Sequence, residues 1–343
     1  MPATPWRRPT CHDRHPTHRP ARLTPSAPFH SGPRRPLAPL SPPRRPASRG
    51  PRLRSAGWSS ETDLQGRPMA LRILAVLAEP GTARACLEAA AAAASVDPAT
   101  TIEALCITED PRGTGESAEE AAIQRLRDHF EGTPQARTEA VHAVYDDWLA
   151  GIAEEHHAQV TWRERAGDEG AVLVAEAPSA DLLILARPHD ISAHDAVHAA
   201  IFHAERPLLV PPDWVRTGGA PLARKIAIAW KSTPQAHRAL VGAGPWLRAA
   251  DEVRVFAVAP SVEVARCEEC HHVLRDLGVK ADTTLLPPGD GDVGDEILKA
   301  IGEWGADALV MGAFRHGAIM EAMLGGTTRT IFAKASLPIF TAH

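Results

Sequence analysis

Apolar runs of strand length alternate with helix-forming segments along residues 70–341, and the whole series occurs twice. An alternation of strands and helices is typical of a mostly parallel sheet with helices on both faces. Two pairs of short segments support an internal duplication: ADLLIL at 180–185 resembles ADALVM at 306–311, and RPLLV at 206–210 resembles LPIFT at 337–341. The sequence therefore predicts two similar α/β units, each with a mostly parallel sheet of about five strands.

The hydrophobic periodicity gives the expected bounds of the elements. In the first unit we expect strands at 71–78, 101–107, 160–163, 181–186 and 207–210, and helices at 83–95, 116–131, 141–155, 169–176 and 193–204. In the second we expect strands at 225–230, 253–259, 281–285, 308–311 and 338–341, and helices at 234–249, 262–277, 292–303 and 327–334. The two units are expected to occupy residues 69–215 and 222–343.

Residues 1–68 form a segment of a different kind, with fifteen Pro, thirteen Arg, no Lys and three acidic residues, and a charge of +10. Pro at this density prevents helices and strands, and the charge opposes collapse, so we expect a disordered leader. It has four interpretations: sequence that is not translated, with Met69 as the true start; a solvated tail; a basic arm for RNA, DNA or acidic partners; or a transit peptide, although no amphipathic helix is evident. The whole chain carries −5, so residues 69–343 carry −15, which argues against nucleic-acid binding by the folded part.

Composition and cysteine spacing favour a cytoplasmic protein. The chain is 44% hydrophobic but only 5% aromatic, which suits a core of small aliphatic side chains. No apolar run reaches the ~18–20 residues of a membrane span, and no secretory signal is evident. The five cysteines are too few and too scattered for a disulfide framework, so a reducing compartment is expected.

Glycine and threonine cluster near the carboxyl terminus. Gly312 closes an apolar run, and Gly325 and Gly326 follow it, directly before Thr327 and Thr328. Glycine lets backbone N–H groups approach an anion, and a helix N-terminus favours negative charge. Ligands in parallel sheets bind beyond the carboxyl ends of the strands. A ligand site is therefore predicted at this loop, together with the residues that follow the strand 225–230.

These residues resemble a known family. The second unit is similar to a universal stress protein domain, and residues 70–343 resemble a tandem pair of such domains; segments 307–314, 324–329 and 337–339 carry the resemblance. Members that bind ATP have a glycine, two residues, a glycine, nine residues, a glycine, and then Ser or Thr. Here the first and third glycines are Gly312 and Gly325, but Arg315 occupies the second position and Gly326 the Ser/Thr position.

The resemblance implies a stress-response regulatory protein that binds ATP or a related adenine nucleotide, with Mg²⁺, in the second unit. The candidate residues are Trp230, Lys231, Ser232, Val258, Gly312, Arg315, Gly325, Gly326, Thr327 and Thr328. Lys231 stands where the family has an acidic residue that contacts the nucleoside. Two alternatives stay open: a regulatory or interaction module with a degenerate site, and a weak ATPase. No catalytic residue is predicted, because GxSxG and GxxxxGK[ST] motifs are both absent.

The first unit departs further from the family pattern. Its strand 181–186 is followed by Arg187-Pro188-His189-Asp190, with no glycine before Pro211, so no backbone anion cradle is predicted there. In the family two domains pair through edge strands, and the resemblance implies that the tandem chain is similar to such a dimer made covalent. The expected partners are thus an adenine nucleotide, the other unit of the chain and a second copy in a homodimer, with neither membrane nor nucleic acid.

Two further groups of side chains have metal-ligand spacing. Cys267-Glu268-Glu269-Cys270-His271 matches the short haem-attachment pattern, and on a helix Cys267, Cys270 and His271 share one face. A metal site or redox pair is one interpretation, and ordinary helix residues are the other. His194 and His198 have i, i+4 spacing, for which the alternatives are a metal site and a solvated helix face.

Overall fold

A computed structural model describes residues 70–108, 128–130, 132–153, 159–187, 193–212, 222–313 and 326–343. We call residues 70–212 the amino-terminal half; its elements are β1 (Arg72–Val76), α1 (Pro80–Ala94), β2 (Thr101–Thr108), α3 (Pro134–Ala150), β3 (Val160–Ala166), α5 (Glu169–Glu176), β4 (Leu182–Ile184), α6 (Ala193–Phe202) and β5 (Leu208–Val210). Residues 222–343 are the carboxyl-terminal half, with β6 (Lys225–Ala229), α7 (Pro234–Gly242), α8 (Gly244–Ala249), β7 (Glu252–Val258), α9 (Val262–Ala265), α10 (Cys267–Asp276), β8 (Asp282–Leu286), α11 (Val293–Trp304), β9 (Ala308–Gly312), α12 (Gly326–Lys334) and β10 (Ile339–Ala342). The expected leader, most of the expected helix 116–131, and Arg315 and Gly325 lie outside the described residues.

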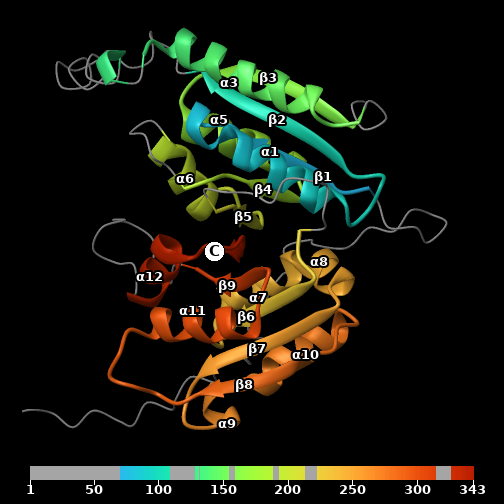
Figure 1. The fold of residues 1–343 in the computed structure, drawn as a ribbon, viewed down its shortest axis with the longest axis vertical. Coiled ribbons are helices and arrows are strands. Elements are labelled where there is room, and N and C mark those ends of the chain that lie inside the picture. The colour runs from blue at the N-terminus through green and yellow to red at the C-terminus, as the bar shows by residue number, and fades with distance from the viewer. Residues whose placement is uncertain are drawn as a thin grey trace, which may run out of the picture. The chain divides into compact units, whose positions relative to one another are not determined.

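One ten-stranded sheet joins the two halves, with the strand order β3-β2-β1-β4-β5-β10-β9-β6-β7-β8 (Figure 1). Each half contributes five strands that are parallel to one another, which confirms the predicted mostly parallel sheets. The halves meet where β5 and β10 pair antiparallel, with Phe340 opposite Leu209. We call this pairing the seam. Pairing through a strand at the edge of each five-stranded set is the arrangement that the resemblance implied.

The two halves share a side-chain contact at the amino ends of their strands. The Asp181 carboxylate accepts a hydrogen bond from the backbone N–H of Arg72, at 2.8 Å, which ties the start of β4 to β1. The Asp307 carboxylate accepts from the backbone N–H of Lys225, at 2.9 Å, which ties the start of β9 to β6. Asp181 and Asp307 occupy equivalent positions in the two segments that the sequence comparison aligned, so this carboxylate has a structural role in both halves.

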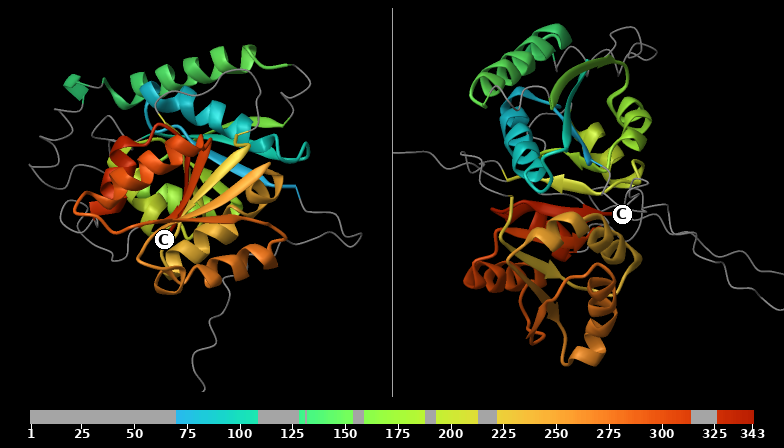
Figure 2. Two further views of the ribbon diagram at one scale, coloured as in Figure 1. Left: turned by 60° about the horizontal axis from the view of Figure 1, so that its bottom comes forward. Right: turned by 90° about the vertical axis from the view of Figure 1, so that its right-hand side faces the viewer.

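Helices cover both faces of the sheet, as the views of Figure 2 show. On one face α1, α3, α7, α8 and α10 bury a core that extends across both halves. On the other face α5, α6, α11 and α12 do the same. The alanines of α1 lie close to the strands: Ala83, Ala89, Ala90 and Ala93 are at most 1% exposed. Small side chains let this helix approach the sheet closely, which explains a core with so few aromatic residues.

Several expected helices begin or end elsewhere. The expected helix 262–277 is divided by Arg266, whose φ of 53° is left-handed, and whose carbonyl oxygen accepts a hydrogen bond from Trp230 Nε1 at 3.2 Å. The expected helix 234–249 is divided at Ala243, directly before Gly244 and a proline. The expected helix 141–155 instead begins at Pro134, after Thr133 caps it. Periodicity alone did not show these boundaries, since tertiary contacts and capping residues set them.

Within the described residues, no helix combines the length and the apolarity needed to cross a bilayer.

Candidate functional site

The carboxyl ends of β6, β7 and β9 lie at one edge of the sheet and bring several predicted residues together. In the strand register, Ala229 is opposite Met311 on one side and Phe256 on the other. Trp230 therefore follows β6 at the level of Gly312, with Val258 at the end of β7. The order of strands reverses between β6 and β9, since β7 and β8 lie beyond β6 while β10 lies beyond β9. Such a switch point is where open α/β sheets bind ligands.

Two helices begin at this edge, one on each face of the sheet. After β6 the chain enters α7, whose Thr233 cap accepts a hydrogen bond from Ala236 N at 3.2 Å. After β9 the chain reaches α12, which begins at Gly326. The N-termini of both helices carry partial positive charge, which favours an anion beyond the carboxyl ends of β6 and β9, the place at which sheets of this kind form a ligand crevice.

Gly312 has a packing role that the sequence pattern did not reveal. A Cβ atom at this position would lie 2.4 Å from Ala236 N and 2.8 Å from Ala236 Cα, in the first turn of α7. Backbone atoms at these distances cannot give way as the end of a flexible side chain can. Glycine at 312 is thus required by the close approach of β9 and α7, whether or not a ligand binds.

The residues after β6 are turned toward α10. The Trp230 indole is 5% exposed, and the Ser232 hydroxyl donates to a carboxylate oxygen of Glu269. Glu269 also forms an ion pair with Arg266, whereas Lys231 is exposed. Sequence reasoning identified no acidic partner for Ser232, because Glu269 lies 37 residues further along the chain.

The first turn of α12 contains the two threonines of the predicted site, Thr327 and Thr328, which are both half-buried. An acidic group that the sequence analysis missed lies beside this turn: a Cβ atom at Gly326 would be 3.6 Å from Oδ2 of Asp292. Asp292 is the N-cap of α11, and its Oδ1 accepts from Gly294 N at 2.8 Å. A carboxylate at this place opposes the approach of a phosphate to α12 unless a cation screens it.

Asp292 is ionised over the ordinary pH range. Loss of hydration raises the pKa of its carboxyl, but the N–H groups of Asp295 and Gly294, the Thr330 hydroxyl and the charge of Lys334 outweigh this effect and lower the pKa below its usual value. Lys334 also pairs with Asp295, at 2.8 Å to both carboxylate oxygens, so α11 and α12 are joined at two places. The electrostatic environment of the α12 start is therefore mixed rather than uniformly positive.

The cysteine pair of α10 faces the core. Cys267 and Cys270 are 3% and 0% exposed, and burial raises the pKa of Cys267 and raises the pKa of Cys270 to about 12. His271 instead lies with Nε2 2.7 Å from the Thr283 hydroxyl of β8. Among the residues that the structure describes, no three His, Cys, Asp or Glu side chains lie close enough together to hold a metal ion. The structure does not describe the side chain of His194, so the metal site predicted for His194 and His198 stays a prediction.

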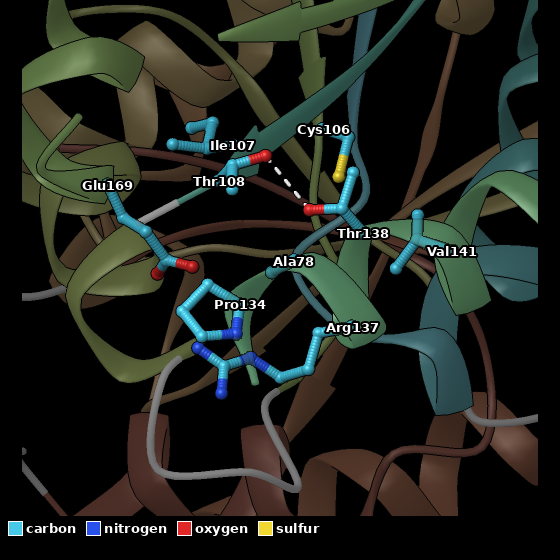
Figure 3. A pocket seen from close by; sticks show the side chains of 9 residues that line it. All are labelled: Ala78, Cys106, Ile107, Thr108, Pro134, Arg137, Thr138, Val141 and Glu169. Atoms are coloured by element: carbon cyan, nitrogen blue, oxygen red, sulfur yellow. Dashed lines mark hydrogen bonds between the residues drawn. The ribbon is translucent and has the colours of Figure 1, made fainter. Parts of the chain in front are cut away.

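The amino-terminal half has a small polar cavity at the ends of β1 and β2 (Figure 3). Thr108 of β2 and Thr138 of α3 share a hydrogen bond of 2.8 Å in its wall, and Glu169 of α5 and Arg137 of α3 lie around it. Its volume of about 10 Å³ is close to what one water molecule requires. The cavity formed by these described residues is too small for a nucleotide.

Comparison with known proteins gives one sequence match and several structural ones. Residues 288–343, which include α11, β9, α12 and β10, match the model of the Universal stress protein family. No curated protein matches the sequence. The family resemblance inferred from the glycine pattern is thus confirmed for the carboxyl-terminal residues.

Solved structures extend the comparison to the fold of both halves. A universal stress protein from Archaeoglobus fulgidus DSM 4304 is 14% identical with a TM-score of 0.51, and the match covers 79% of this chain and 96% of that one. Another universal stress protein from Archaeoglobus fulgidus is 22% identical with a TM-score of 0.29, and the match covers 34% of this chain and 94% of that one. The first of these shows a shared fold, and the low identity carries no statement about ligand or activity.

Proposed function

We propose that this chain, which has the fold of a universal stress protein and matches that family over residues 288–343, is a stress-response regulatory protein that binds an adenine nucleotide between β6 and β9. The proposal places it in the cytoplasm, where the buried free thiols of Cys86, Cys106, Cys267 and Cys270 would stay reduced. In this proposal the protein binds the nucleotide and does not need to catalyse a reaction on it. The seam between β5 and β10 takes the place of the interface between two separate domains.

The observation that carries the proposal is the convergence of two helix N-termini at the switch point of the sheet. α7 begins next to Gly312, and α12 begins at Gly326, on opposite faces of the crevice. Both α12 and Gly312 belong to the segment that matches the family. Thr327 and Thr328 would offer hydroxyl groups to a phosphate, and Val258, which is half-buried at the end of β7, would offer apolar surface to a base.

Some groups beyond the ends of β6 and β9 favour a bound nucleotide, and others oppose it. The helix N-termini favour phosphate, but the ionised Asp292 beside Gly326 repels it. Mg²⁺ bound with the nucleotide would supply the positive charge that offsets this carboxylate. We therefore expect binding that depends on Mg²⁺ and is weaker than that of a site with the full glycine pattern.

A module with a degenerate site is the second candidate, and the contacts of Ser232 favour it. Its hydroxyl is engaged by Glu269, and Lys231 stands where a ribose hydroxyl would need an acceptor. The weak-ATPase alternative would use Ser232 with Glu269 as its base. Because the Glu269 carboxylate is already engaged by Arg266, this alternative has less support.

Equilibrium binding of labelled ATP to the full chain, with and without Mg²⁺, tests the proposal. We expect saturable binding below about 1 mM that requires Mg²⁺. Thr328→Val should weaken it, whereas Thr82→Val, a threonine of α1 away from the crevice, should not. Mass spectrometry of nucleotide that co-purifies with the protein gives an independent check. No saturable binding at that concentration would exclude the proposal in favour of the degenerate module. Gly312→Glu is unsuitable as a test variant, since any side chain there meets the α7 backbone.

A further inference from the structure

Arg187 of the amino-terminal half contacts the helix that begins at the proposed site. It lies three residues after β4, and its guanidinium donates to the carbonyl oxygens of Phe332 at 2.5 Å and Ala335 at 3.1 Å. These carbonyls are at the carboxyl end of α12, where a helix leaves its last carbonyl groups without partners inside the helix. An arginine fork at this end of a helix also interacts favourably with its dipole.

The opposite end of the same helix is the start of the proposed site. α12 has only nine residues, about 13 Å by the rise of an α-helix, so Gly326 and Arg187 act on one short rigid element. Ile331 in the middle of α12 is fully buried, and Lys334 pairs with Asp295 of α11. The orientation of the first turn is thus determined by α11 on one side and, across the seam, by Arg187.

The sequence positions of Arg187 support a specialised role. Asp181 and Asp307 are equivalent, so Arg187 corresponds to Ala313, which directly follows Gly312 in the carboxyl-terminal half. The carboxyl-terminal half has Gly312 and Ala313 at the start of its loop. The amino-terminal half has Arg187 at the position of Ala313, and this side chain contacts the carboxyl-terminal half. The half without a glycine loop therefore contributes a side chain to the half that retains one.

We propose that Arg187 is a positioning residue for the nucleotide site: it fixes α12 to the amino-terminal half and thereby orients the Gly326–Thr328 turn. This inference rests on the proposed function and adds to it a role for the half that lacks its own site. Binding at the start of α12 and the Arg187 contact at its end then stabilise one another, because coupling between two sites is reciprocal.

Arg206 offers a matched control. Its guanidinium donates to the carbonyl oxygens of Ala177 at 3.2 Å and Pro178 at 2.9 Å, just after α5, within its own half. Arg206→Met and Arg187→Met each remove a fork from two backbone carbonyls, which lie at the end of α12 for Arg187 and after α5 for Arg206. Arg187→Lys keeps the charge and one donor, so it should restore part of the effect.

The test measures ATP–Mg²⁺ affinity and hydrogen exchange of residues 326–335 in the full chain. For Arg187→Met we expect affinity to fall roughly 2- to 30-fold, the range for residues that couple sites without touching the ligand. Exchange should rise at residues 330 and 331, whose amides bond to carbonyls of the first turn in an α-helix, as well as at 332–335. Arg206→Met should leave both readouts at the wild-type level, and Arg187→Lys should lie between.

Three results would overturn the inference: an unchanged affinity in Arg187→Met, an equal loss in Arg206→Met, or faster exchange confined to residues 332–335. The last would show a helix cap without a positioning role. If the wild type binds no nucleotide, the proposed function fails. Exchange at residues 330 and 331 in the nucleotide-free protein then still decides whether Arg187 holds the start of α12.

Discussion

The backbone of α7 requires glycine at position 312, whether or not a ligand binds nearby. The pattern of glycines along the chain assigned this residue to anion binding, whereas its surroundings assign it to close packing of a helix on a strand. The two roles are compatible, since a tight approach of α7 also brings its N-terminus to the crevice. A substitution at 312 consequently reports on stability before it reports on binding.

We predict that Gly312→Ala lowers the free energy of unfolding by about 1–3 kcal/mol, the usual cost of overpacking. A methyl group there would lie 2.4 Å from Ala236 N, so β9 and α7 would have to separate. Gly302→Ala is the control, because Gly302 lies inside α11 with no atom within 4 Å of a new Cβ. Alanine should stabilise that helix by up to about 1 kcal/mol. Urea unfolding of both variants measures their free energies of unfolding. Equal changes in the two variants would contradict the packing argument.

Buried thiols give a second prediction for single residues. Burial raises the pKa of Cys86, of Cys106 and of Cys270 to about 12, so these groups stay protonated well above the ordinary thiol range. The thiolate is the reactive form. We therefore expect iodoacetamide at about pH 8 to alkylate them far more slowly in the folded chain than in the chain unfolded in urea. Mass spectrometry of tryptic peptides measures each site, and similar rates in both states would refute the burial that the structure shows.

His343 predicts a pH dependence of stability. Its ring packs on Phe202 with centroids 5.0 Å apart, and burial, then Arg238 of α7 and His203 after α6, lower its pKa from 6.5. Protonation is thus disfavoured in the folded state. The contribution of neutral His343 to the free energy of unfolding is fully present above pH 6.5. It is lost as the pH falls below that value, since the unfolded chain takes up the proton first. His343→Phe keeps an aromatic ring without the charge, so its Tm should fall less than that of the wild type between about pH 7.5 and pH 5.5. If the Tm of the wild type and of His343→Phe fell equally over this pH range, His343 would not be the source of the pH dependence.

Strands and helices differed in how well the sequence predicted them. Each expected strand corresponds to an observed one, because buried parallel strands are continuous apolar runs. The helix breaks at Ala243 and Arg266 were not predicted, since an amphipathic pattern can continue through a break that tertiary contacts impose. The same limit applies to the candidate site. Gly312 and Trp230 lie at the strand ends, as the sequence predicted, but Glu269, Asp292 and Arg187 come from distant segments and carry no local pattern.

Contacts between helices of the two halves give a prediction at the level of elements. Trp246 of α8 donates through Nε1 to the carbonyl oxygen of Ala93, at the end of α1, at 3.0 Å. Trp148 of α3 is also buried, at 1% exposed against 4% for Trp246, but its Nε1 has no hydrogen-bond partner among the described atoms. Phenylalanine at either position removes a similar volume. Trp246→Phe should therefore cost about 1–3 kcal/mol more than Trp148→Phe, because only the former leaves a buried carbonyl without its donor. Urea unfolding measures the difference, and equal costs would contradict the prediction.

At the scale of the whole molecule, one sheet and two shared cores make the halves a single structural unit. The cores on both faces include residues from each half, and the seam adds backbone hydrogen bonds between β5 and β10. Trp246, Phe340 and Arg187 add side-chain contacts across the same boundary. A half without the glycine pattern can therefore be retained for what it contributes to its partner, because loss of either half would expose the core of the other.

Such continuity predicts that residues 70–343 unfold in one cooperative transition. Opening the amino-terminal half alone would expose the apolar faces of β10, α8 and α12 to water, so an intermediate with one folded half should be poorly populated. Hydrogen exchange at increasing urea concentration tests this: the slowest amides of α1 and of α11 should converge on one opening free energy. Trp246→Phe, which weakens the contact between halves, should lower both values together. Separate free energies for α1 and α11, or an effect of Trp246→Phe on only one of them, would show instead that the halves unfold independently.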